Sequence, residues 1–147
     1  MGVLGFLILI VLGIVGLAGG GSLGHVIDIP SALIVVGGFL SLMLMAFGSR
    51  FGTAIKTVFQ KHAGRHALIF GIAVFERGRS FTVAAGVVGT MVGVVNMLAN
   101  LNLDNIAALG PGLATAAITS IYCLGLAYGV LQPVVISLKR RLTQAAG

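Results

Sequence analysis

Charged side chains are scarce in this sequence, and acidic side chains are almost absent. Only 8% of the 147 residues are charged, and three of these are acidic, whereas charged residues make up about a quarter of an ordinary soluble domain. With 58% hydrophobic residues and a mean hydropathy of +1.13, the chain has the composition of an integral membrane protein. The one cysteine, Cys123, has no second cysteine to pair with, which excludes a disulfide within the chain.

The nine basic residues give a formal net charge of +6, but they are few and flank apolar stretches. One group falls in the segment 49–80 and the other, Lys139 to Arg141, follows the last apolar stretch. Basic residues gather on the cytoplasmic side of membrane proteins. We therefore predict that both termini and the segment 49–80 are cytoplasmic, and we expect no nucleic-acid partner.

Four apolar stretches are each close to the roughly 20 residues that a membrane-spanning helix needs. They cover about residues 2–19, 31–48, 82–101 and 113–138. The first stretch lacks a basic segment before it, so we expect a retained span and not a cleaved signal. The prediction is an all-α membrane domain over residues 1–147 with four transmembrane helices. In the cytoplasmic loop 49–80 we expect two short helices, at the membrane surface or extending the second and third spans.

Glycines recur at helical spacing in the last two predicted spans. Small residues three or four positions apart let the backbones of neighbouring membrane helices approach closely. The residues that we expect to serve such packing are Gly86, Gly89 and Gly93 in the third span and Gly125 and Gly129 in the fourth.

Hydroxyl groups lie inside the same two spans. Thr90 needs a hydrogen-bond partner in hydrocarbon, which is either a carbonyl of its own helix or a group on a neighbouring helix or in a wet cavity. Thr119 and Ser120 lie in the fourth span, and adjacent residues on a helix point about 100° apart, so both cannot face one pore equally. These hydroxyls either satisfy packing alone or line a polar seam that guides an ion.

An ion carrier normally needs an ionisable group within the bilayer. Asp28, Glu76 and Asp104 are the only acidic residues, and all fall at span ends or in connections. The chain therefore does not resemble a self-sufficient proton antiporter. It also lacks a nucleophile with its base, a phosphate-binding loop and a set of metal ligands, so we expect neither enzymatic activity nor a cofactor.

Three stretches resemble the MotA branch of the MotA/TolQ/ExbB ion-channel family. They are IDIPSALIVVGG at residues 27–38, GVVGTMVG at 86–93 with Met97 and Leu98, and the segment from Gly110-Pro-Gly through Thr119-Ser120 to Pro133. The resemblance implies a ring-forming four-span subunit of the bacterial cytoplasmic membrane. It further implies a homo-pentamer around a dimer of single-span MotB-like partners, whose membrane aspartate carries a translocated proton or sodium ion. Thr90, Thr119 and Ser120 would line the ion path, and ion flow would rotate the ring.

The sequence departs from the family pattern at three places. Ser120 stands where the family usually has threonine, which keeps the hydroxyl, and Val83 stands where it usually has proline at the inner mouth of the third span. The cytoplasmic loop is much shorter than in flagellar MotA proteins, whose charged loop residues push on a rotor protein. A reduced coupling surface would consist of Arg65, Glu76, Arg77 and Arg79, although such charges also flank membrane spans in general.

The resulting hypothesis is a stator-type subunit of a proton- or sodium-driven rotary motor like that of the flagellum. Two alternatives stay open. One is an energiser of an envelope process, like ExbB or TolQ, and the other is a structural membrane scaffold that conducts nothing.

Overall fold

The computed structural model describes residues 28–60, 63–99 and 109–145, and every regular element in these ranges is helical. The first predicted span and Asp104 lie outside the described residues. Among the described residues three helices are long and apolar enough to cross a membrane: Ile29–Phe47, Arg65–Ala99 and Gly112–Gln144. This confirms an all-α membrane protein. The first of the four predicted spans, the position of the termini and the ring remain predictions.

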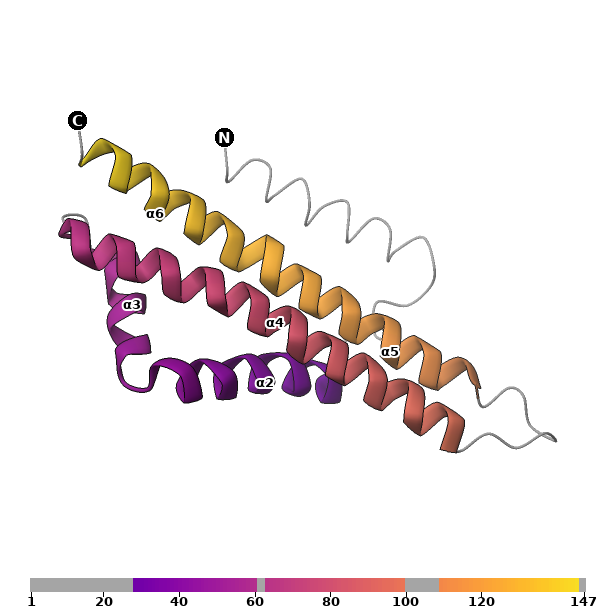
Figure 1. Cartoon of the computed structure of the whole chain (residues 1–147). Helices are drawn as coiled ribbons and strands as arrows, with labels where there is room; N and C mark the ends of the chain where they lie inside the picture. The colour runs from indigo at the N-terminus through magenta and orange to yellow at the C-terminus, as the bar shows by residue number, and fades with distance from the viewer. Residues whose placement is uncertain (1–27, 61–62, 100–108, 146–147) are drawn as a thin grey trace.

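Helix α2 (Ile29–Phe47) begins and ends at residues suited to those positions. Asp28 caps its first turn, because the carboxylate accepts a hydrogen bond from the backbone N–H of Ser31, and Pro30 follows where a missing N–H costs nothing. The helix stops at Gly48, whose φ of 53° is favourable only for glycine. The chain then turns sharply into α3 (Arg50–Phe59), which runs across the bundle to the start of α4 (Figure 1).

Helix α4 (Arg65–Ala99) contains 35 residues and is the central element of the fold. It joins the third predicted span to the second half of the predicted loop without interruption, so that half of the loop extends the span. Helix α3 is a separate short helix. The segment 49–80 therefore contributes one crossing helix and one extension of a membrane helix.

Helices α5 (Leu109–Leu124) and α6 (Gln132–Gln144) continue one another through a π-helical segment, Gly125–Leu131. Together they form one rod that lies antiparallel along α4 (Figure 1). The cause of the wider turn is Pro133, which has no N–H to donate and whose ring would clash with the carbonyl of Gly129 in a regular α-helix. Accordingly the N–H of Gln132 bonds to the carbonyl of Ala127, five residues back.

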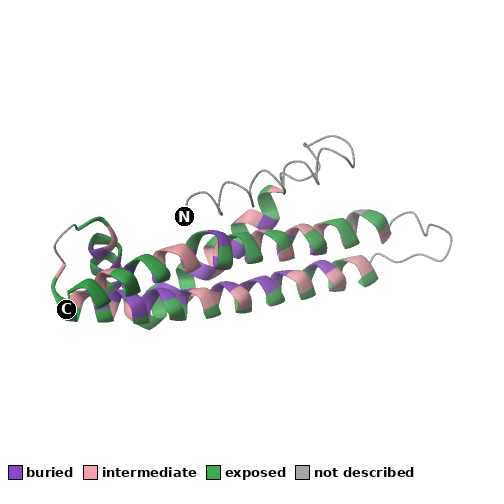
Figure 2. Cartoon of the chain, turned by 90° about the horizontal axis from the view of Figure 1, so that it is seen from above, coloured by how far each residue is buried: buried purple, intermediate pink, exposed green. Residues whose placement is uncertain are grey.

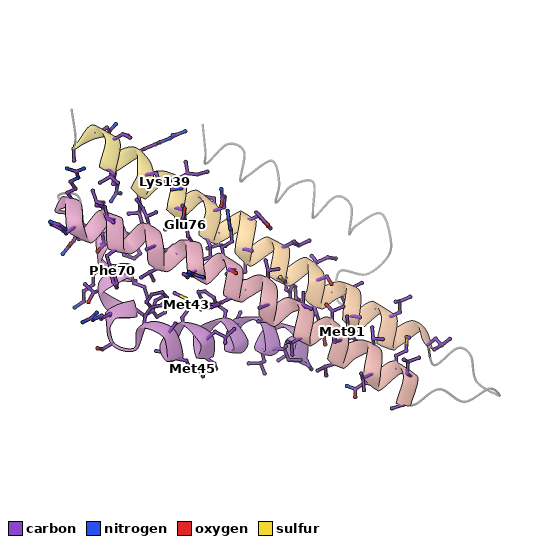
Figure 3. The ribbon with its side chains drawn as sticks, in the orientation of Figure 1. Met43, Met45, Phe70, Glu76, Met91 and Lys139 are labelled. Atoms are coloured by element: carbon purple, nitrogen blue, oxygen red, sulfur yellow. The ribbon has the colours of Figure 1, made fainter. Side chains whose placement is uncertain are left out.

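Large side chains form the core at one end of the bundle, where α2, α3, α4 and α6 meet. Phe39 and Phe51 pack edge to face with their ring centres 6.2 Å apart, and Phe47 and Phe70 do the same at 6.4 Å. Met43 is fully buried and points from α2 toward α4, while Met45, two residues on, is 83% exposed and points away (Figure 3). Toward the other end, small residues replace these side chains and bring α4 and α5 close together.

Exposed surface runs along the outer sides of α2, α4 and α5 (Figure 2). Much of it is apolar, with Leu33, Met91, Val95 and Leu113 each at least 60% exposed. A soluble monomer rarely exposes so much apolar surface. These faces are suited to contact with lipid or with other membrane helices.

Candidate ion-path site

A groove of about 250 Å³ lies between α4 and α5 in the region of the small residues. Its lining residues are Val83, Gly86, Val87, Thr90, Met91, Ser120, Cys123 and Leu124. Met91 marks its position on α4 in Figure 3. None of the lining residues is charged, and Thr90 and Ser120 are the two that carry hydroxyl groups. The groove is thus apolar except where the hydroxyls of Thr90 and Ser120 lie.

The hydroxyls of Thr90 and Ser120 are 2.9 Å apart, within hydrogen-bond distance. Thr90 also donates to the carbonyl of Gly86 at 2.8 Å, and Ser120 lies 3.2 Å from the carbonyl of Ala116. A hydroxyl has one proton to donate and two lone pairs. Each hydroxyl has one proton and an own-helix carbonyl within reach, so at most one of them donates to the other, and lone pairs of both oxygens remain able to bind a proton donor or a cation. Both kinds of hydrogen-bond partner predicted for Thr90, a carbonyl of its own helix and a group on a neighbouring helix, are therefore present, and the ion path itself stays a prediction.

Glycines of α4 allow this close approach of the two helices. A Cβ atom placed on Gly86 would overlap the side chain of Cys123, and one on Gly93 would lie 3.2 Å from the Cβ of Ala116. At Gly89 a Cβ would meet both Thr119 on α5, at 2.7 Å, and Ile34 on α2, at 2.8 Å. These three glycines thus lie in packing within one chain, not on its outer surface.

The two glycines predicted in the fourth span are placed differently from each other. Gly125 is exposed, and a Cβ atom there would meet no atom within 4 Å, whereas Gly129 is buried. Both lie in the π-helical segment, where a spacing of four residues no longer brings side chains onto one face. The sequence did not indicate a further close approach, in which a Cβ on Gly112 would lie 2.6 Å from Met97.

Thr119 does not share the groove with Ser120. Its side chain is 1% exposed and donates to the hydroxyl of Ser31 on α2 at 2.8 Å. Ser31 in turn donates to the carboxylate of Asp28, whose backbone N–H donates to the hydroxyl of Tyr122 at 3.2 Å. In this arrangement the Thr119 side chain is enclosed between helices. The part of Thr119 in lining the ion path stays a prediction.

Sequence reasoning missed the roles of Asp28, Ser31 and Tyr122. The signal was present in the run Asp28-Ile-Pro-Ser31, in which an N-cap residue, a proline and a residue with a short hydroxyl side chain open a helix. What the sequence does not contain is the partner on α5. The depth at which α2 starts relative to α5 follows only from the packing of the helices.

Metal binding finds no support in the described part of the chain, where no group of three or more His, Cys, Asp or Glu residues comes together.

Comparison with known proteins identifies the family of the chain. The family described as the MotA/TolQ/ExbB proton channel family matches residues 50–146, which include α3, the α4–α5 hairpin and α6. The chain belongs to this family. Its similarity to a motility protein and to PomA, given below, places it among the MotA-like members.

Among curated proteins, Motility protein A of Aquifex aeolicus (strain VF5) is 42% identical over 69 residues, 47% of this chain and 26% of that protein. The uncharacterized protein YtxD of Bacillus subtilis (strain 168) is 41% identical over 71 residues, 48% of this chain and 25% of that protein. Chemotaxis protein PomA of Vibrio alginolyticus is 36% identical over 74 residues, 50% of this chain and 28% of that protein. The chain therefore aligns with about a quarter of the length of these relatives.

The position at which this MotA-like chain departs from the family proline, Val83, lines the groove. Valine keeps a backbone N–H that a proline would lack, so α4 continues through this position without a break. The end of the groove at Val83 is accordingly built from an uninterrupted helix.

The four predicted coupling residues all lie in the N-terminal half of α4, but they divide into two kinds. Glu76 forms an ion pair with Lys139 of α6, with the Nζ and Oε1 atoms 2.7 Å apart (Figure 3). Arg79 donates to the side chain of Gln132 and lies over the ring of Tyr128, 5.8 Å from its centre. Arg65 and Arg77 are exposed. Half of this set is thus engaged in holding α4 to the α5–α6 rod.

Proposed function

We propose that the chain is an ion-conducting, stator-type subunit of a proton- or sodium-driven rotary motor in the bacterial cytoplasmic membrane. The observation that supports this most is the pair of hydroxyls of Thr90 and Ser120, which meet in an otherwise apolar groove between two membrane helices. Hydroxyl oxygens suit the passage of a proton or of a partly hydrated cation. Thr119, the third hydroxyl of the predicted path, faces Ser31 on α2 and not the groove.

A complete ion path requires an ionisable group beside the hydroxyl pair. Among the described residues no charged one lines the groove, so we propose that the group comes from another protein. We propose a dimer of single-span, MotB-like partners whose membrane aspartate passes the groove, surrounded by a homo-pentamer of this chain. The exposed apolar faces of α2, α4 and α5 are suited to these contacts with further helices.

Replacing both hydroxyls tests the proposed ion path. Thr90→Val together with Ser120→Ala removes both hydroxyls and keeps nearly the same volume. We expect proton or sodium flux to fall at least about a hundredfold, because an ion would cross an entirely apolar stretch at a cost of several kcal/mol. The measurement is ion flux into lipid vesicles that contain the chain purified together with the single-span protein that co-purifies with it.

Thr82→Val is the matched control, since Thr82 is also a buried threonine of α4 but its hydroxyl bonds to the Gly78 carbonyl of its own helix; the backbone carbonyl of Thr82, which accepts from Cys123, stays in the variant. We expect this control to retain flux. Unchanged flux in the double variant, in a complex of normal size, would contradict the ion path and favour the structural scaffold.

One observation favours a second function within the same family, the energising of an envelope process as by ExbB or TolQ. Two of the four charged residues available for a rotor contact, Glu76 and Arg79, are held in contacts within the chain. A flagellar rotor contact would then depend on Arg65 and Arg77. If reversing both charges, Arg65→Glu with Arg77→Glu, leaves the driven process intact, the envelope function is favoured.

A further inference from the structure

The beginning of α2 is bonded to α5 at two points. At the first point the hydroxyl of Thr119 donates to the hydroxyl of Ser31, which is 0% exposed. At the second point the backbone N–H of Asp28 donates to the hydroxyl of Tyr122. We refer to Asp28, Ser31, Thr119 and Tyr122 as the α2–α5 clamp.

Both α5 residues of the clamp lie on one face of their helix, because residues three apart are neighbours on a helix surface. On the α2 side, the carboxylate of Asp28 accepts both the backbone N–H and the hydroxyl proton of Ser31. The lone pairs of the Ser31 hydroxyl are then directed to accept from Thr119. Asp28 therefore orients Ser31, and Ser31 holds Thr119.

Holding Thr119 has a consequence for the residue that follows it. Ser120 points about 100° away from Thr119 around the helix axis, and in this direction it meets Thr90. A rotation of α5 by one residue would bring Thr119 to the groove in place of Ser120. The rotation of α5 about its own axis thus decides which hydroxyl faces the groove.

We propose that Asp28 and Ser31 are positioning residues, which fix the rotation of α5 so that Ser120, and not Thr119, completes the hydroxyl pair of the groove. A rotated α5 would leave the buried hydroxyl of Ser31 without its donor and would break the bond to Tyr122, and both losses disfavour it. Buried polar contacts are known to specify register between packed helices. The meaning of the clamp for transport rests on the proposed ion path, whereas its effect on helix rotation does not.

Disulfide cross-linking measures the rotation of α5 about its own axis. In a Cys123→Ala background, one chain carries Thr90→Cys with Ser120→Cys and a second carries Thr90→Cys with Thr119→Cys. Mild oxidation of the full complex gives one cross-linking yield for each of the two chains. The yield with Ser120→Cys divided by the yield with Thr119→Cys is the ratio that reports which residue faces Thr90. A general loosening of the fold lowers both yields and leaves the ratio, so the ratio separates positioning from stability. The substitution Thr119→Cys keeps a weak S–H donor toward Ser31.

Introducing Ser31→Ala is expected to lower this ratio about fivefold, as the loss of one intramolecular hydrogen bond predicts. Asp28→Asn keeps a side-chain acceptor and the backbone N–H, so it should leave the ratio unchanged, as should the control Thr82→Val. An unchanged ratio in Ser31→Ala would overturn the proposal. If Ser31→Ala does not accumulate, Tyr122→Phe must lower the ratio instead, and an unchanged ratio there overturns the proposal equally. A fall in Asp28→Asn would overturn the assignment of Asp28 as a hydrogen-bond acceptor.

Ion flux measured on the same variants separates this inference from the proposed function. A lowered ratio together with lowered flux in Ser31→Ala is the expected result. A lowered ratio in a complex that conducts no ions even without substitutions would keep the clamp and overturn the ion path.

Discussion

Four buried or partly buried threonines fall into two kinds that the sequence does not distinguish. The hydroxyls of Thr57 and Thr82 bond to the carbonyl four residues back, at 3.0 and 2.9 Å. The hydroxyls of Thr90 and Thr119 lie 2.8 Å from the corresponding carbonyl and also lie within hydrogen-bond distance of a serine hydroxyl on another helix. The backward bond satisfies any threonine in a membrane helix. The second bond depends on which face of the helix is covered, and it marks the residues that hold helices together.

Gly86 is the position where the smallest change is expected to do the most damage. In Gly86→Ala the added methyl group would overlap the side chain of Cys123, closer than packed atoms allow. Separating α4 from α5 should destabilise the chain by about 1–3 kcal/mol, as overpacking of a tight interface does. The measurement is thermal unfolding of the purified protein in mild detergent.

Gly37→Ala is the matched control for that substitution. Gly37 also lies inside a membrane helix, but a Cβ atom there would meet no atom within 4 Å in the chain. Alanine favours the helix over glycine by roughly 1 kcal/mol, so the unfolding temperature should stay the same or rise. Equal destabilisation by both substitutions would mean that the contact with Cys123 is not what limits the approach of α4 and α5.

Apolar length and helical spacing predicted the three long apolar helices of the described residues, and the predicted bounds are close at both ends for α2 alone. The third span and the second half of the loop form one helix because nothing in the described stretch from Arg65 to Ala99 breaks it. The sequence left open whether the loop helices extend the spans or lie apart, since short amphipathic patterns fit both. The π-helical segment could have been suspected from Pro133, but its length and its effect on Gly125 and Gly129 depend on packing against α4.

The C-terminal end of α3 is bonded to a side chain of α6. The guanidinium of Arg141 donates to the carbonyls of Val58 and Gln60, at 3.1 and 3.2 Å, and so satisfies the C-terminal end of α3. In Arg141→Ala we expect amide hydrogen exchange in α3 to rise about tenfold, because hydrogen bonds from a charged donor to the helix end are lost. Exchange measured by mass spectrometry on the purified protein checks this.

Arg140→Ala provides the comparison, because Arg140 is adjacent and exposed. It removes the same charge and should leave exchange in α3 unchanged. If both substitutions raise exchange equally, the general positive charge of α6 stabilises α3, and the specific hydrogen bonds do not.

For the whole molecule, the family and the presence of hydroxyls in the last two spans could be predicted from the sequence. The separation of Thr119 from Ser120 followed from helix geometry, but which of the two would face the groove did not. That choice depends on where α2 starts beside α5, as the bonds of Ser31 and Asp28 show. It is a property of three helices together, so no single stretch of sequence contains it.

No described residue that lines the groove has an acidic or basic side chain, and we propose that the ion-carrying group comes from a partner protein. The measurement that tests this is the mass and subunit composition of the complex purified in mild detergent with the protein encoded beside it. We expect a pentamer of this chain around a dimer of single-span chains that carry an aspartate within the membrane. A monomer, or an oligomer of this chain alone that contains no acidic partner, would contradict it.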